Sequence, residues 1–316
     1  MRIKAKAAAR RCAGRAARAN VMIVAMAIAM AIAGCDAGAH RDDAAASGVP
    51  RIVSLAPSTT EMIFALGAGG EVEGVSQYCD YPPEVLKLPK VGTFLTPNIE
   101  AIAALRPTIV IGLATSSDLR EVRALDAMDY TTLMVRDDSI AEIEAGIARI
   151  GARLGRREAA QAVIMRMRER IAGVERRLDG TAARPTLMVV GHQPMVAVGR
   201  GTFLDELLGL AHAANIADVA DQQWPRLSLE YIIAARPQVI LDGQMGTDPS
   251  VPSSFWAHYP SIPAVRDGRV RGYAQDPMLH PGPRIVDSLE ILARLIHPEV
   301  FARADAAQAS AGGASR

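Results

Sequence analysis

The chain has 316 residues, half of them hydrophobic and only 4% aromatic, with 35 Lys and Arg against 34 Asp and Glu. Seven of the basic residues and none of the acidic ones lie in the first 34 positions, so the remainder has 28 basic and 34 acidic residues and a net charge of −6. This acidic balance argues against nucleic-acid binding. The length is sufficient for two small lobes whose cores need no disulfide.

The N-terminus has the pattern of a lipoprotein signal peptide over residues 1–34. A basic stretch precedes the apolar run Val21–Ala33, which is too short to span a bilayer comfortably. The run ends in Ile-Ala-Gly-Cys35, which resembles the lipobox of bacterial lipoproteins, where the cysteine is lipidated and becomes the new N-terminus. We expect periplasmic localisation with a lipid anchor at Cys35; an ordinary secretory signal is the alternative.

Removal of the signal peptide leaves Cys79 as the only cysteine besides the lipidated one, so no intramolecular disulfide is expected. Residues 35–49 are small and polar and predict a flexible tether. Residues 302–316 are rich in Ala, Gly and Ser and predict a disordered tail.

Strands and helices alternate over residues 50–155. Short apolar strands are predicted at Arg51–Leu55, 72–75, 108–112 and 131–135. Pro57 ends the first strand, and Ser58 to Glu61 reads as a capping box that opens a helix. This alternation predicts an N-terminal lobe with a parallel, doubly wound sheet.

A long helical stretch without any strand signal follows. Apolar residues keep helical spacing from Ser139 to Leu154, Gly155 interrupts the pattern, and the spacing resumes until Leu178. A helix of about twenty residues is about 30 Å long, near the diameter of a small domain. We therefore assign residues 156–180 to a spine helix between two lobes.

A second α/β series occupies residues 181–301. It contains predicted strands at 186–190, 239–242 and 269–273, a helix at 203–210 and a closing amphipathic helix at 283–296. The predicted fold is therefore α/β, with two Rossmann-like lobes of parallel sheets joined by a single long spine helix. Ligands bind such folds at the carboxyl ends of the strands and between the lobes.

One phrase of sixteen residues occurs twice, 130 positions apart: TPNIEAIAALRPTIVI over 96–111 and RLSLEYIIAARPQVIL over 226–241. Each copy reads as a polar N-cap, an acidic first turn, a helix, a Pro break and an apolar strand. The matched positions are Asn98 with Ser228, Glu100 with Glu230, and Arg106 with Arg236. Two lobes of similar build would each present a carboxylate at an equivalent place.

These features together resemble the helical-backbone (class III) substrate-binding proteins of ABC importers, over nearly the whole mature chain. The resemblance is strongest to the cobalamin-binding members. It rests on both copies of the repeat and on residues 51–61 (RIVSLAPSTTE), 76–83 (SQYCDYPP), 91–94 (VGTF), 224–230 (WPRLSLE), 263–266 (PAVR) and 282–286 (GPRIV). The disulfide of the family's second lobe is missing.

The resemblance implies a role for each matching position. Glu100 and Glu230 would dock on arginines of the permease dimer, whose ATPase subunits drive transport. Tyr78, Phe94 and Trp224 would contact a corrin ring, with Phe94 where the best-known members have Trp. Asp276 and His280 fall near the family's polar ligand contacts. We expect a monomer that captures cobalamin or a related corrinoid, with no resident cofactor or metal and no catalytic residues.

Several alternatives stay open. The ligand could be a ferric siderophore or haem, for which Tyr78 or His280 could supply an axial ligand. The protein could also be a membrane-anchored sensor without a transporter. Glu100 and Glu230 could be first-turn carboxylates that only favour the helix dipole. His192 and His280 are expected to make ordinary polar contacts, with coordination of cobalt or iron as the alternative for either. Trp256 is expected to be structural. No hydrolase, metalloprotease or nucleotide-binding motif is present.

Overall fold

The computed structural model describes residues 49–116, 120–218, 222–243, 254–273, 278 and 280–302, which from Pro50 onward belong to one compact unit. The predicted signal peptide, Cys35 and Asp276 lie outside these residues, as does the tail from residue 303.

The N-terminal lobe is built on a four-stranded sheet with the order β2-β1-β3-β4. All its pairings are parallel, as predicted. Its strands are β1 (Ile52–Ser54), β2 (Val72–Val75), β3 (Ile109–Leu113) and β4 (Thr132–Val135). Its helices are α2 (Pro57–Ala65), α3 (Ile99–Ala104), α4 (Arg120–Ala127) and α5 (Ile140–Arg153), with short 3-10 helices at Gly69–Glu71, Pro83–Lys87 and Ala114–Ser116.

The C-terminal lobe contains a second sheet with the order β6-β5-β8-β9, and β7 also pairs with β5. Its strands are β5 (Arg184–His192), β6 (Met195–Ala197), β7 (Ala213–Asn215), β8 (Val239–Asp242) and β9 (Val270–Gly272). Its helices are α7 (Phe203–Leu210), α8 (Leu229–Ala235), α9 (Pro263–Arg266) and α11 (Ile285–Ile296), with a 3-10 helix at Ser254–His258. The pairings are parallel except that β6 runs antiparallel to β5. Three residues gave too little sequence signal to predict β6.

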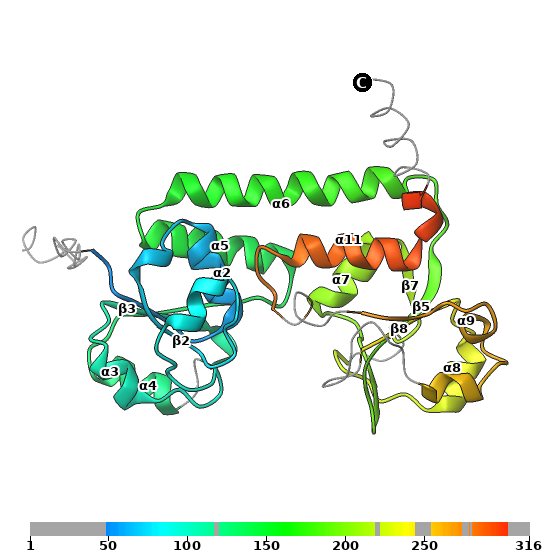
Figure 1. Ribbon diagram of the computed structural model, residues 1–316, viewed down its shortest axis with the longest axis horizontal. Helices are drawn as coiled ribbons and strands as arrows, with labels where there is room; N and C mark the ends of the chain where they lie inside the picture. The colour runs from blue at the N-terminus through cyan, green and yellow to red at the C-terminus, as the bar shows by residue number, and fades with distance from the viewer. Residues whose placement is uncertain are drawn as a thin grey trace, which may run out of the picture. The chain divides into compact units, whose positions relative to one another are not determined.

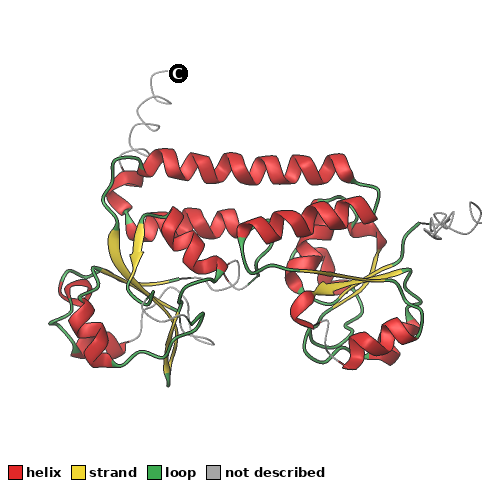
Figure 2. Ribbon diagram, turned by 180° about the vertical axis from the view of Figure 1, so that it is seen from behind, coloured by secondary structure: helices red, strands yellow, loops and turns green. Residues whose placement is uncertain are grey.

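A single long helix, α6 (Arg157–Leu178), runs along both lobes (Figures 1 and 2). It is separated from α5 by Gly155, which has a φ of 69° that favours glycine over other residues. Its inward side buries Ala160, Val163, Met167, Val174 and Leu178. The predicted α/β fold of two lobes joined by a spine helix is therefore confirmed.

The start of α2 differs from the predicted capping box. The helix begins at Pro57, which suits the first helical position because its missing N–H would have had no partner there. The residue before it, Ala56, provides no side-chain cap, so Ser58 is not the N-cap. The Ser58 hydroxyl is thereby free for a different contact, described below.

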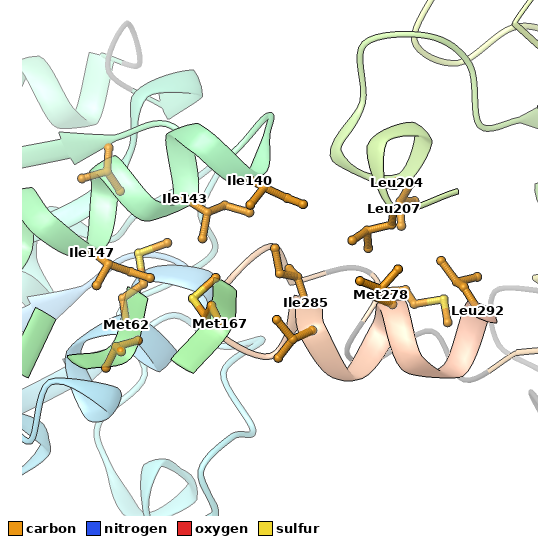
Figure 3. Close-up of a cluster of buried hydrophobic side chains, with 14 of the residues drawn as sticks. Met62, Ile140, Ile143, Ile147, Met167, Leu204, Leu207, Met278, Ile285 and Leu292 are labelled. Carbon is orange, nitrogen blue, oxygen red and sulfur yellow. The ribbon is translucent and has the colours of Figure 1, made fainter. Parts of the chain in front are cut away.

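The largest hydrophobic cluster extends through both lobes. Figure 3 shows Met62, Ile143 and Ile147 from the first lobe, Met167 from α6, and Leu204, Leu207, Ile285 and Leu292 from the second lobe as members of one buried group. Each lobe also has a smaller cluster of its own. Because interiors are close-packed, a shared core opposes large movements of one lobe against the other.

Candidate functional site

Two exposed loops lie side by side where β2 ends. Tyr78 follows β2 and is 52% exposed. The neighbouring Gln77 N–H donates to the Gly92 carbonyl oxygen at 2.8 Å, which places this loop beside the turn that carries Phe94. Hydrogen bonds between Thr93 and Thr96 brace that turn. The structure therefore brings together the loops of Tyr78 and Phe94, which the sequence separates by sixteen positions.

Trp224 lies in the second lobe, on the segment before α8, and is 46% exposed. The segment is held against the end of β6, because the carbonyl oxygens of Gln223 and Pro225 accept hydrogen bonds from Gly199 N–H and Ala197 N–H. A Cβ at Gly199 would lie 2.1 Å from the Gln222 carbonyl oxygen, so only glycine fits this approach. Trp256, by contrast, is buried in the core of this lobe.

His280 and the residues after it lie where the two lobes meet. The carbonyl oxygen of His280 accepts a hydrogen bond from Gly282 N–H at 2.7 Å. A Cβ at Gly282 would lie 3.4 Å from both the Ser58 carbonyl oxygen and a carboxylate oxygen of Glu61. This segment thus passes directly over the start of α2 in the other lobe.

A buried ion pair joins the lobes at the same place. Arg284 donates to both carboxylate oxygens of Glu61, at 2.9 Å and 2.6 Å. The guanidinium carbon also lies 3.8 Å from the centroid of the Tyr81 ring, a cation–π distance. Tyr81 is itself 44% exposed. The pair links the segment before α11 to α2, and sequence reasoning missed it because 223 positions separate the partners.

A second polar pair lies at the carboxyl ends of β5 and β8. His192 Nε2 lies 2.6 Å from Oδ1 of Asp242, whose side chain is fully buried. The rings of Phe255 and Trp256 meet the imidazole edge to face. Burial and the Asp242 charge also raise the pKa of the nearby Tyr273 hydroxyl. His192 thus makes a polar contact, as expected. Its partner is the Asp242 carboxylate, which fixes the orientation of the ring.

A third polar pair lies at the carboxyl ends of the first sheet. Ser58 Oγ donates to Oδ2 of Asp137 at 3.2 Å, and Asp137 is only 8% exposed. Burial is the main reason why the pKa of Asp137 is raised to about 6, and the negative charges of Asp138 and Glu142 add to the effect. The pair borders a cavity of about 230 Å³, lined by Ala114, Thr115, Arg136, Asp137 and Asp138.

Cys79 is buried beneath the Tyr78 loop. Its Sγ lies 3.2 Å from the Thr60 hydroxyl, and burial raises the pKa of the thiol to about 11. The thiol is therefore protonated at neutral pH and poorly reactive.

The two copies of the repeat fold alike. Asn98 Oδ1 caps α3 by accepting from Ala101 N–H, and Ser228 Oγ caps α8 by accepting from Tyr231 N–H. Glu100 and Glu230 are both exposed in the first turn of their helices. In both views, α3 and α8 lie on the side of their lobes away from α6 (Figures 1 and 2).

The match extends to the backbone beyond each helix. Arg106 and Arg236 both have positive φ angles, of 47° and 51°. The next strand is joined to the first strand of its lobe in the same way, by Thr108 N–H to the Arg51 oxygen and by Gln238 N–H to the Pro185 oxygen. The recurrence in the sequence is therefore a recurrence in structure.

Two features often associated with other activities are not found within the described residues. No helix in this part of the chain is long and apolar enough to cross a bilayer. No group of three or more His, Cys, Asp or Glu side chains among these residues has an arrangement that could hold a metal ion.

The comparison with protein families decides the class. The family model for periplasmic binding proteins matches residues 52–277, most of both lobes. The chain belongs to this family. Its fold is that of class III periplasmic binding proteins, a family of solute-binding proteins and not of enzymes.

Individual relatives of this periplasmic binding protein carry more specific names. The ABC transporter substrate-binding lipoprotein YvrC of Bacillus subtilis is 30% identical over 260 residues, covering 79% of this chain and 81% of YvrC. A vitamin B12-binding protein of Vibrio cholerae is 27% identical over 241 residues, covering 76% of this chain and 86% of the relative.

Solved structures extend the comparison. The periplasmic vitamin B12-binding protein BtuF of Vibrio cholerae superposes with a TM-score of 0.69 at 26% identity, covering 78% of this chain and 96% of BtuF. The periplasmic haem-binding protein RhuT of Roseiflexus superposes with a TM-score of 0.71 at 27% identity, covering 80% of this chain and all of RhuT.

Proposed function

We propose that this protein captures cobalamin or a related corrinoid between its two lobes and delivers it to the permease dimer of an ABC importer. The observation that carries the proposal is the pair of exposed aromatic side chains, Tyr78 on one lobe and Trp224 on the other. Exposed rings with a polar tip suit a large planar ligand, because they offer apolar area and a hydrogen bond together. The names of the relatives in Vibrio cholerae support the same ligand.

The remaining predicted site residues extend this proposal. Phe94 would add a third ring beside Tyr78. His280, and Asp276 outside the described residues, would contact polar side arms of the ligand. Glu100 and Glu230 would dock on the permease, because each projects from the first turn of an equivalent helix on the same side of its lobe. Lipidation of Cys35 would hold the protein at the periplasmic face of a membrane, and the name of YvrC as a lipoprotein supports this.

A haem or a ferric siderophore is the second candidate. RhuT, a haem-binding protein, matches this chain about as well as BtuF does. The paired His192 and Asp242 provide an oriented imidazole at a strand end, the place where ligands bind such folds.

Calorimetric titration of the purified protein with cyanocobalamin, haemin and a ferric hydroxamate tests the proposal. Tight one-to-one binding of cyanocobalamin alone is the expected result. If another chelate bound and cyanocobalamin gave no heat, the proposed role in an importer would stand, but the ligand would be that chelate. Absence of binding to all three would favour a sensor of a different molecule.

A further inference from the structure

The cavity beside Asp137 is here called the Asp137 pocket. It is lined by Ala114, Thr115, Arg136, Asp137 and Asp138. It follows the carboxyl ends of β3 and β4, where ligands of open α/β sheets bind. The connection from Asp137 to α5 also contacts the other lobe, because Ile140 N–H at the start of α5 donates to Glu206 of α7 at 2.8 Å. The pocket's volume of about 230 Å³ is below that of sites for whole ligands, which are about 300 to 1,000 Å³. The pocket therefore fits a side arm of a ligand and not its macrocycle.

The chemistry of the pocket is that of a hydrogen-bond acceptor. Asp137 is 8% exposed and accepts a hydrogen bond from the Ser58 hydroxyl, but among the described residues no basic side chain forms an ion pair with it. The nearest basic residue in the lining, Arg136, pairs instead with Asp138 and Glu142. A desolvated carboxylate without a cationic partner costs folding free energy, which is a feature expected of functional sites more than of structural ones.

We propose that the Asp137 pocket anchors a hydrogen-bond-donating side arm of the ligand, of the primary-amide class that corrinoids carry, and thereby selects against ligands with carboxylate arms. This inference rests on the proposed function. An ionised carboxylate accepts an amide N–H in a charge-assisted hydrogen bond, about twice as strong as a neutral one. The same charge repels a carboxylate arm. Asp137 would thus distinguish an amide-bearing chelate from one with free propionates.

The selection should depend on pH. The pKa of Asp137 is about 6, so the carboxylate form is present above pH 6 and is lost as the pH falls through this value. The acidic groups near it are Asp138 and Glu142, and Arg136 is the basic residue of the lining. Glu206 of α7 accepts a hydrogen bond from Ile140 N–H, three positions further along the chain. Burial and the charges of Asp138 and Glu142 raise the pKa of Asp137, whereas the Ser58 hydrogen bond lowers it.

The test compares Asp137→Asn with the unchanged protein in calorimetric titrations of cyanocobalamin between pH 5 and pH 8. Above pH 7 we expect Asp137→Asn to bind about tenfold more weakly, the loss of a charge-assisted hydrogen bond. The affinity of the unchanged protein should fall as the pH drops through about 6, and that of Asp137→Asn should stay flat. A cobalamin monocarboxylate that carries the carboxylate on the anchored arm should show the opposite pH dependence.

Two further variants separate anchoring from general effects. Asp126→Asn removes an exposed carboxylate on α4, outside the lining of the pocket, and should leave the affinity unchanged. Ser58→Ala removes the hydrogen bond that lowers the Asp137 pKa and should move the midpoint of the pH profile upward. Thermal unfolding of each variant checks that it is folded.

The outcomes separate this inference from the proposed function. Equal affinities and pH profiles for Asp137→Asn and the unchanged protein, with cyanocobalamin still bound, would overturn the pocket's role alone. An equal loss in Asp126→Asn would also overturn it, because the effect would then be one of general charge. No binding of cyanocobalamin by the unchanged protein would overturn both.

Discussion

The two lobes are alike in the repeated helix–strand segment and differ in the buried carboxylates at the carboxyl ends of their strands. The exposure pattern of the repeated phrase is the same in both copies except at Pro97 and Leu227. The buried carboxylates at the strand ends, however, have different partners: a hydroxyl for Asp137 and an imidazole for Asp242. A two-fold symmetric permease would require equivalent docking surfaces, whereas an asymmetric ligand requires none. Under the proposed function, the matched surfaces would face the permease and the unmatched strand ends would face the ligand.

The largest expected effect comes from reversing both matched charges. The double variant Glu100→Lys, Glu230→Lys should abolish stimulation of the importer's ATPase while leaving ligand affinity unchanged, because both side chains are exposed and neither is among the proposed ligand contacts. ATPase assays with the reconstituted importer, alongside calorimetry, measure the two properties separately.

The matched control for that experiment is Glu121→Lys, another first-turn carboxylate, on α4. It should stimulate the ATPase normally. If the double variant also stimulated the ATPase normally, the repeat would have a structural role only and no role in docking.

The second effect is on the junction of the lobes. Glu61→Gln should lower the free energy of unfolding by about 3 kcal/mol, because it leaves the Arg284 charge buried without its carboxylate. Chemical denaturation measures this change. Arg51, whose ion pair with Glu73 is well exposed, offers the control, since Glu73→Gln should cost about 1 kcal/mol or less. Similar costs for both variants would mean that the junction is not a special point of the fold.

The third effect concerns the ligand's side. Trp224→Ala should weaken ligand binding by about tenfold or more, or at least about 1.4 kcal/mol, through loss of an aromatic contact. The chain has two tryptophans, so ligand-induced quenching of the fluorescence should also disappear with Trp224. Trp256→Phe should retain both affinity and quenching, since Trp256 is buried. Undiminished affinity in Trp224→Ala would contradict the role of this ring.

The smallest effect tests how alike the copies are. Asn98→Ala and Ser228→Ala should each lower the free energy of unfolding by about 1 kcal/mol, because each removes an N-cap hydrogen bond of the same geometry. Ser228→Asn, which keeps a capping oxygen, should change little. A large difference between the two alanine variants would show that the copies share their backbone geometry but not the stabilisation that the N-cap provides.

Features of local origin were predictable from the sequence, and contacts between distant segments were not. The strand at Val72–Val75, the N-caps at Asn98 and Ser228 and the break at Gly155 follow from β-branched residues, capping side chains and a glycine. The start of α2 was misread because Pro57 could occupy the first turn as well as end the strand.

The candidate site shows the same division. The aromatic residues and the matched glutamates could be selected from motifs, and the structure places them on exposed loops and first turns. The pairing of Ser58 with Asp137 spans 79 positions and gives no periodic signal. The only hint was a pair of aspartates, Asp137 and Asp138, one residue beyond a predicted strand, at the edge where ligands bind.

The shared hydrophobic cluster of Figure 3 has a consequence for competition at the importer. Because one core extends through both lobes, the spacing of Glu100 and Glu230 should be nearly the same with and without a ligand. An empty protein would then occupy the permease about as readily as a filled one. The rate of delivery would depend on the occupied fraction of the population, and an excess of empty protein would slow uptake.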